Sequence, residues 1–390
     1  MDEIHLTRCR TPDGTVVGVD VADGVVVATP ASFGDRAAGE VVDCGGRLVL
    51  PALVDAHVHP DKTTWGGPWL SRRSCTTLQE FMAADVEVQR NLTLSVADRT
   101  EGLLRHAAHQ GTRAVRAHVD VTPEVGLGNL HGVLEAAQRL LGVVDVQTVA
   151  FPQLGLLSAP GTTELMAAAL AEGADVVGGL DPLGVDDDLD GHLDVVFGLA
   201  RRHSAPVDLH LHDDGEPGLA QLLAIASRTR AEGMGGLVTV SHAFALATAS
   251  RQRRAEVAQA LADSGVAVTT CALGGDPVLP LWELQEAGVA VAVGSDGVRD
   301  AWTPFGTGSM IDRAHLLAYR LDAMTDVALT DCYRACSGAG ADLVGIPRAG
   351  LDIGAVADLV VVDAGSPAEL VVDRPAPSLV LRGGRPLPSA

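Results

Sequence analysis

The chain contains eight short β-type runs separated by helix-like stretches, and this alternation restricts its fold more than any other feature. The runs are VLPALVDAHVH, AVRAHVDV, VDVQTVAFP, ADVVGGL, APVDLHLH, GLVTVSH, VAVTTC and VAVAVGSD. Helix-like stretches lie between them, for example at 164–173, 218–233 and 253–265, and several end in glycine, a common helix stop. Eight strands that alternate with helices favour a closed parallel barrel over an open sheet. We therefore predict a (β/α)8 TIM-type barrel over residues 51–344.

The two ends of the chain have a different pattern, in which short β-type runs are joined directly by turns. VVGVDVADGVVVA contains the favoured turn pair Asp23-Gly24, and SLVLRGGRPL contains Gly383-Gly384. We expect residues 1–50 and 345–390 to form one small β-sandwich built from both termini.

Composition excludes several classes of function. The net charge of −22 argues against a nucleic-acid or anionic-membrane partner, because both require a basic surface. The first residues, MDEIHLTRCRTPDG, lack the apolar core of a signal peptide, and no run approaches the roughly 20 apolar residues of a membrane-spanning helix. The six cysteines are scattered and form no CxxC pair. These features predict a cytoplasmic protein with reduced thiols.

Polar residues stand at corresponding ends of the predicted strands. Nearly every run is apolar until its last residues; these ends include His57, His59, Asp120, Gln153, His210, His212, Asp213, His242 and Asp296. In a parallel barrel these ends lie on one face, which is the face where barrel enzymes carry their active sites. The pattern therefore predicts a single functional site at that face.

Two of the strand ends carry histidines two residues apart. Residues i and i+2 of a strand point to the same side, so His57 and His59 share a face, as do His210 and His212. An HxH pair alone is as often structural as functional. Together with a histidine from the fifth run and Asp296 from the eighth, the pair predicts a site for Zn²⁺, Fe²⁺ or a related ion.

Four segments carry a family resemblance. GRLVLPALVDAHVHPDK, DLHLHDDGE, VSHAFALA and VGSDGVRDAW resemble the amidohydrolase superfamily, and within it the cytosine deaminase group, which includes the N-alkylammelide amidohydrolases. AFPQ at 150–153 and AEGM at 231–234 fit the same group. The likeness implies one divalent metal ion, because the fourth run contributes no bridging lysine or glutamate. The ligands it implies are His57, His59, His210 and Asp296.

The resemblance also implies roles for residues around the metal. Asp296 and His242 would handle the protons of the attacking water, and Asp213 would serve a ring nitrogen. The substrate-binding residues would be Gln153, Lys62, His212 and Trp302. The implied reaction is hydrolytic removal of an amine from a nitrogen heterocycle such as a pyrimidine or an s-triazine. The family further suggests a homo-oligomer.

Two departures bear on the substrate. Asp213 stands where cytosine deaminase has a glutamate, and Gly297 stands where that group has an acidic residue that can bind an exocyclic amine. Lys62 and His212 instead favour an oxygen-rich or anionic ring. Two alternatives without a role in binding stay open: Lys62 could be a surface lysine, and Gln153 could only hold a loop in place.

Two other functions fit the same residues less well. The same metal site in a cyclic-amide or imide hydrolase would open a ring instead of expelling an amine. A metal-binding protein without catalysis would need neither Asp296 nor His242 as a proton carrier, so we favour an enzyme.

Overall fold

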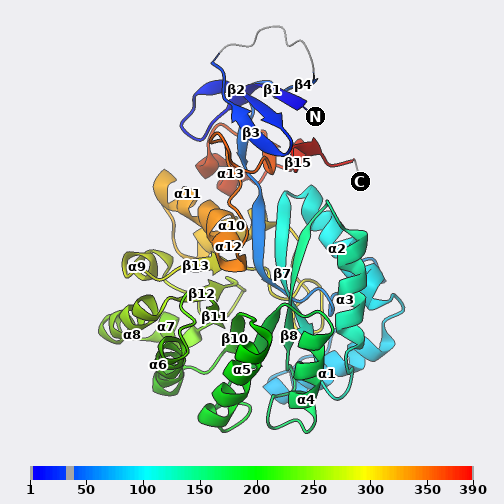
Figure 1. Cartoon of the computed structure of the whole chain (residues 1–390), viewed down its shortest axis with the longest axis vertical. Helices are drawn as coiled ribbons and strands as arrows, with labels where there is room; N and C mark the ends of the chain where they lie inside the picture. Colours follow the sequence, from blue (N-terminus) through cyan, green and yellow to red (C-terminus); the bar gives the residue numbers. More distant parts are fainter. Residues whose placement is uncertain (1–2, 32–38, 389–390) are drawn as a thin grey trace.

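A computed structural model describes residues 3–31 and 39–388 of the chain, which form a barrel with a small sheet against one end (Figure 1). The barrel strands run parallel in chain order, each pairing with the next. They are β6 (Leu53–Val58), β7 (Thr112–Asp120), β8 (Asp145–Phe151), β9 (Val176–Leu180), β10 (Val207–Leu211), β11 (Val238–His242), β12 (Val266–Thr270) and β13 (Val291–Val293). The predicted barrel is confirmed.

The barrel closes between the first strand and the segment that follows the last one. Val58 forms a parallel bridge with Asp296, whose backbone N–H donates to the carbonyl of His57 at 2.8 Å. Gly294 allows this approach, because a Cβ at that position would lie only 2.4 Å from the Cβ of His57. The closure therefore places two of the predicted metal ligands beside a third.

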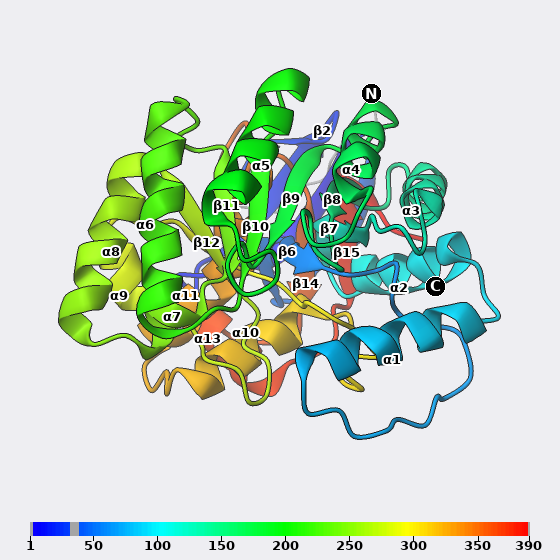
Figure 2. The same ribbon diagram turned by 90° about the horizontal axis from the view of Figure 1, so that it is seen from below.

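Helices cover the outside of the barrel strands (Figure 2). Between β6 and β10 they are α1 (Leu78–Asn91), α2 (Val96–His109), α3 (Gly128–Arg139), α4 (Thr162–Ala171) and α5 (Leu189–His203). The later ones are α6 (Gly215–Ala231), α7 (Phe244–Thr248), α8 (Arg251–Ser264), α9 (Leu281–Glu286), α10 (Met310–Arg320), α11 (Asp326–Ala335), α12 (Gly338–Val344) and α13 (Pro367–Asp373). Their inner faces and the strands share one core rich in alanine, valine and leucine, as the scarcity of aromatic residues predicts.

The terminal segments together form a mixed sheet with its own small core. Its strands are β1 (Glu3–Arg10), β2 (Val16–Ala22), β3 (Val25–Ala28), β4 (Glu40–Asp43), β5 (Leu48–Pro51), β14 (Leu359–Val362), β15 (Leu379–Arg382) and β16 (Arg385–Pro386). β14 pairs with β5, which joins the two ends of the chain. A unit built from both termini is confirmed, and its boundaries at 50 and 345 stay a prediction.

Two further predictions concern the chain as a whole. In the described part of the chain, no helix is both long and apolar enough to cross a membrane. The six cysteines are all free thiols, and Cys9 and Cys44 of the small sheet place their sulfur atoms 3.5 Å apart.

Candidate active site

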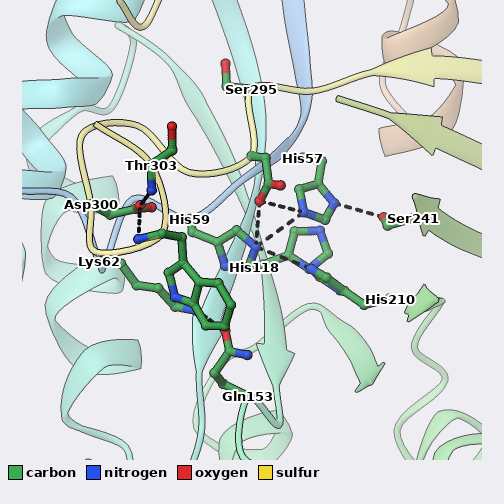
Figure 3. Close-up of polar contacts among 12 residues, drawn as sticks. His57, His59, Lys62, His118, Gln153, His210, Ser241, Ser295, Asp300 and Thr303 are labelled. Atoms are coloured by element: carbon green, nitrogen blue, oxygen red, sulfur yellow. Dashed lines mark hydrogen bonds and ion pairs between the residues drawn. The ribbon is translucent and has the colours of Figure 1, made fainter. Parts of the chain in front are cut away.

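The carboxyl ends of the barrel strands open into a cavity of about 450 Å³. Its lining combines the histidines of the strand ends with aromatic and polar residues from strand ends, loops and helices around them. Eight of the predicted site residues line it: His59, Lys62, Gln153, His210, His212, His242, Asp296 and Trp302. His57 is fully buried beside them, and Figure 3 shows its ring turned toward those of His59 and His210.

The four predicted ligands converge at the floor of this cavity. Nε2 of His59 lies 3.3 Å from Nε2 of His57 and 3.3 Å from Nε2 of His210. Oδ1 of Asp296 lies 3.4 Å from the same atom of His59 and 3.7 Å from that of His57. Two ligands about 2.05 Å from a shared tetrahedral centre stand about 3.3 Å apart, so this donor set fits a small divalent metal ion.

Other groups around His57 could in principle compete for a metal ion. Donor atoms of His57, His210 and His242 lie within 4.8 Å of one another, as do those of His57, Cys271 and Asp296. We favour the set with His59 because its separations of 3.3–3.7 Å match one coordination sphere. His242 then stands at the edge of the metal site, where the sequence predicts a proton-handling residue.

A hydrogen-bond chain fixes the orientation of His57. Its Nδ1 lies 2.8 Å from Oγ of Ser241, which lies 2.7 Å from Oδ1 of Asp208, and Oδ2 of Asp208 accepts from Arg116 at 2.8 Å. A carboxylate paired with a guanidinium only accepts, so Ser241 donates its proton to Asp208 and accepts from Nδ1–H of His57. Nε2 of His57 is therefore the unprotonated atom, and it faces the other ligands, as metal binding requires.

Burial keeps the remaining ligand histidines neutral. It lowers the pKa of His59 and of His210 well below 6.5, and the positive charge of Lys62 lowers the pKa of His59 further. Burial raises the pKa of Asp296, but the surrounding histidines outweigh it and hold that pKa well below 3.8. Neutral imidazoles and an ionised carboxylate are the protonation states of metal ligands.

Lys62 is a buried cation on the cavity wall. It is 2% exposed, its Nζ lies 3.0 Å from Oδ1 of Asp120 and 4.0 Å from Oδ2 of Asp85, and it donates to Oε1 of Gln153. Burial lowers the pKa of Lys62, but Asp120, Asp85 and Asp61 outweigh it and raise the pKa above 10.5. The surface alternative for Lys62 is therefore wrong, and Asp120 at the end of the second run is its ion-pair partner.

His212 is held by a residue that the sequence analysis did not single out. Its Nδ1 lies 2.8 Å from Oδ2 of Asp181, and its backbone N–H donates to Oδ1 of the same carboxylate at 2.6 Å. Its ring stacks on that of His242, with the centroids 4.4 Å apart. Asp181 directly follows the fourth β-type run, and this position was the signal that could have identified it.

Asp213 does not join the other predicted residues in lining the cavity. Its Oδ2 accepts hydrogen bonds from the backbone N–H of Gly184 at 2.9 Å and from the side chain of Gln221 at 2.8 Å. Its predicted role toward a ring nitrogen stays a prediction. Trp302, by contrast, lies at the cavity with its indole stacked on Phe81 at a centroid distance of 5.5 Å.

Two more buried residues of the site escaped prediction or were left open. His118 is fully buried, with its ring centroid 3.9 Å from that of His57, and neither of its ring nitrogens has a hydrogen-bond partner among the described residues. Ser241 stands one residue before His242 in a mostly apolar run. Nothing in the sequence indicates its bond to His57. Only the packing of neighbouring strands brings these side chains to the ligand.

Comparisons with known proteins cover nearly the whole chain. A model of the amidohydrolase family matches residues 90–388. N-isopropylammelide isopropyl amidohydrolase from Pseudomonas sp. (strain ADP) is 32% identical over 358 residues, which are 88% of this chain and 87% of that protein. The crystal structure of N-isopropylammelide isopropylaminohydrolase from Burkholderia multivorans ATCC 17616 has a TM-score of 0.95 and 37% identity, with 99% and 98% of the two chains covered. That of 5-methylcytosine deaminase from Klebsiella pneumoniae, liganded with 5-fluorocytosine, has a TM-score of 0.87 and 26% identity, with 99% and 97% covered.

Proposed function

Because this chain belongs to the amidohydrolase family, we propose that it removes an amine from a planar, oxygen-bearing nitrogen heterocycle. The chain is a hydrolase of carbon–nitrogen bonds other than peptide bonds. The observation that carries the proposal is the convergence of three imidazoles and one carboxylate at the floor of a cavity whose wall holds a buried lysine.

His57, His59, His210 and Asp296 would hold one divalent ion, Zn²⁺ or Fe²⁺. When bound, such an ion would lower the pKa of water from 15.7 to about 7 and so supply hydroxide at neutral pH. Asp296 accepts the proton that water loses, because its carboxylate lies at the edge of the ligand set. His242, which also lines the cavity, would hold the water by a hydrogen bond as it attacks.

The leaving nitrogen must receive a proton as its bond to the ring carbon breaks. Asp213 is the predicted partner of the ring nitrogen, and His212 is better placed because it lines the cavity. With Nδ1 of His212 bound to Asp181, its Nε2 remains for the substrate. We therefore assign proton delivery at the ring to His212, positioned by Asp181, with Asp213 holding the loop that carries it.

The walls of the cavity favour a flat ring that carries oxygen. Trp302 and Phe151 present aromatic surfaces, and Nζ of Lys62 lies 5.3 Å from the ring centroid of Phe151. A ring between these surfaces can direct an oxygen atom toward Lys62 and a polar edge toward Gln153. The N-isopropylammelide hydrolases that this chain resembles act on a ring of this kind, by their names. A cytoplasmic location and a homo-oligomeric assembly remain part of the proposal.

The test is amine release by metal-loaded protein across cytosine, isocytosine, ammelide, N-alkylammelides, pterins and creatinine, with mass spectrometry of the products. We expect ammonia or an alkylamine from an oxygen-bearing ring, together with the ring that gained one oxygen. His210→Ala should lose metal and turnover together, whereas His131→Ala, an exposed histidine on α3, should lose neither.

Two outcomes would contradict the proposal. A ring-opened product without free amine would show a cyclic-amide hydrolase. A His210→Ala protein that keeps both its metal and its turnover would show that the ligand set is wrong.

A further inference from the structure

Asp300 lies on the cavity wall, in the turn after β13, and among the described residues only one of its carboxylate oxygens has a hydrogen-bond partner. Its Oδ1 accepts the backbone N–H groups of Trp302 and Thr303, each at 2.9 Å. Its Oδ2 has no hydrogen-bond partner among the described residues, although the residue is only 1% exposed. Figure 3 shows Asp300 beside Thr303, on the side of the site where Lys62 lies.

Gly297 explains how this carboxylate reaches the cavity. A Cβ at position 297 would lie 2.3 Å from Oδ2 of Asp300 and 2.9 Å from its Cγ. The carboxylate thus occupies the space that a side chain at 297 would need. The sequence has glycine, not an acidic residue, directly after Asp296. Asp300, four residues after Asp296, places its carboxylate in that space instead.

An unpartnered buried carboxylate oxygen is costly unless a ligand supplies a donor. Burial raises the pKa of Asp300 to about 7, the negative charges of Asp85 and Asp296 add to the effect, and Lys62 opposes it. Lys62 itself makes no ion pair with Asp300, because Asp120, Asp85 and Gln153 hold its ammonium group. The cavity thus contains a buried acceptor, Oδ2 of Asp300, and a separate buried donor, the ammonium group of Lys62. A ligand that carries both a donor and an acceptor complements this pair.

We propose that Asp300 determines substrate specificity by accepting, at Oδ2, a hydrogen bond from an N–H group of the substrate ring. Lys62 and Gln153 bind the adjacent ring oxygen, so the cavity selects rings with an –NH–C(=O)– edge. Oδ1 holds the turn through Trp302 and Thr303, and Oδ2 accepts the hydrogen bond from the ligand. This inference rests on the proposed function, because it names the ring edge that the same site binds.

Asp300→Asn separates these two tasks. Asparagine keeps the Oδ1 acceptor for Trp302 and Thr303, and it replaces Oδ2 with an NH₂ donor that opposes a ring N–H. Calorimetry would measure the Kd of ammelide and of its ring-N-methyl derivative with metal-loaded protein, without any need for turnover. We expect N-methylation to weaken binding to the unmodified protein by about ten- to a hundredfold, and Asp300→Asn to weaken ammelide binding by a similar factor.

Asp276→Asn is the matched control, since Asp276 is another carboxylate that lines the cavity. It removes the same charge and should leave the ratio of the two Kd values unchanged. Gly297→Ala is a second route to the same result, because its methyl group would displace the Asp300 carboxylate. It should weaken ammelide binding as Asp300→Asn does.

The readouts separate this inference from the proposed function. If ammelide binds but is not hydrolysed, and Asp300→Asn abolishes the preference for the N–H ring, the inference stands and the proposed reaction fails. If Asp300→Asn keeps its metal, its melting temperature and the original ratio of Kd values, Asp300 only holds the turn. If Asp300→Asn does not fold, an unchanged ratio in Gly297→Ala would overturn the inference in the same way.

Discussion

Replacing Ser241 by alanine tests whether the support of a ligand, and not only the ligand itself, determines metal binding. Ser241 is fully buried, and its hydroxyl joins Nδ1 of His57 to Asp208 through bonds of 2.8 and 2.7 Å. The substitution removes one oxygen atom and leaves the side chains of the four predicted metal ligands unchanged. His57 then loses the acceptor that fixes its tautomer, and Asp208 loses one donor.

The two losses can be estimated separately. Removing a supporting partner of a ligand histidine typically weakens metal affinity 10- to 100-fold, which corresponds to about 1.4–2.7 kcal/mol. Leaving Oδ1 of the buried Asp208 without its donor costs about 1–3 kcal/mol of folding stability. Arg116 still donates to Oδ2 of Asp208 at 2.8 Å, so we expect the lower half of that stability range.

The assay is competition for Zn²⁺ between the protein and a chromophoric chelator, with urea unfolding of the metal-free protein measured in parallel. Ser264→Ala is the control, because Ser264 is also a buried serine but bonds only to the backbone carbonyls of Ala260 and Leu261. It should leave the metal affinity unchanged. Zinc affinity of Ser241→Ala within twofold of the unmodified protein would refute the inferred tautomer chain.

Two further substitutions test the wall and the seam of the barrel. Lys62→Met leaves the buried carboxylate of Asp120 without its cation and should lower the free energy of unfolding in urea by about 3–5 kcal/mol. The double variant Lys62→Met/Asp120→Asn should recover part of this loss. Additive effects of the two substitutions would contradict the pairing. Gly294→Ala places a methyl group against His57 and should lower stability by about 1–3 kcal/mol and weaken metal binding, as melting temperature and metal content would show. Gly274→Ala, with no atom near its added methyl group, is the control, and equal effects of the two would exclude a packing cause.

The residues at the floor of the cavity could be predicted because they obey the regular geometry of strands. His57 and His59 are two apart at the end of β6, and a strand directs such residues to one side. His210 stands within β10, and the parallel order of the barrel brings its end to the same face. Asp296 follows β13 where the chain bridges back to β6. Periodicity and topology therefore predicted a metal site at the floor of the cavity, and the family resemblance implied His210 as the ligand from the fifth run.

The walls of the cavity could not be predicted in the same way, because they lie beyond the ends of the strands. β10 ends at Leu211, and the direction of Asp213 is decided by its bonds to Gly184 and Gln221. The place of Asp300 depends on the two backbone N–H groups that fold the turn around it. Such bonds form between segments whose positions the spacing of residues does not reveal.

This division between floor and walls has a consequence for how substitutions should act. Ser241 bonds to His57, a proposed metal ligand, so its replacement should lower activity on all rings by the same factor. Asp300 contacts no proposed ligand residue by a hydrogen bond, so its replacement should change the ratio between rings while metal content stays constant. If both variants changed the ratio of activities on different rings equally, the floor and the walls of the cavity would be coupled. The strand geometry that positions the floor would then also determine the substrate. The separate hydrogen-bond sets of the two residues argue for independence, because residues in one shared hydrogen-bond network are the ones that couple.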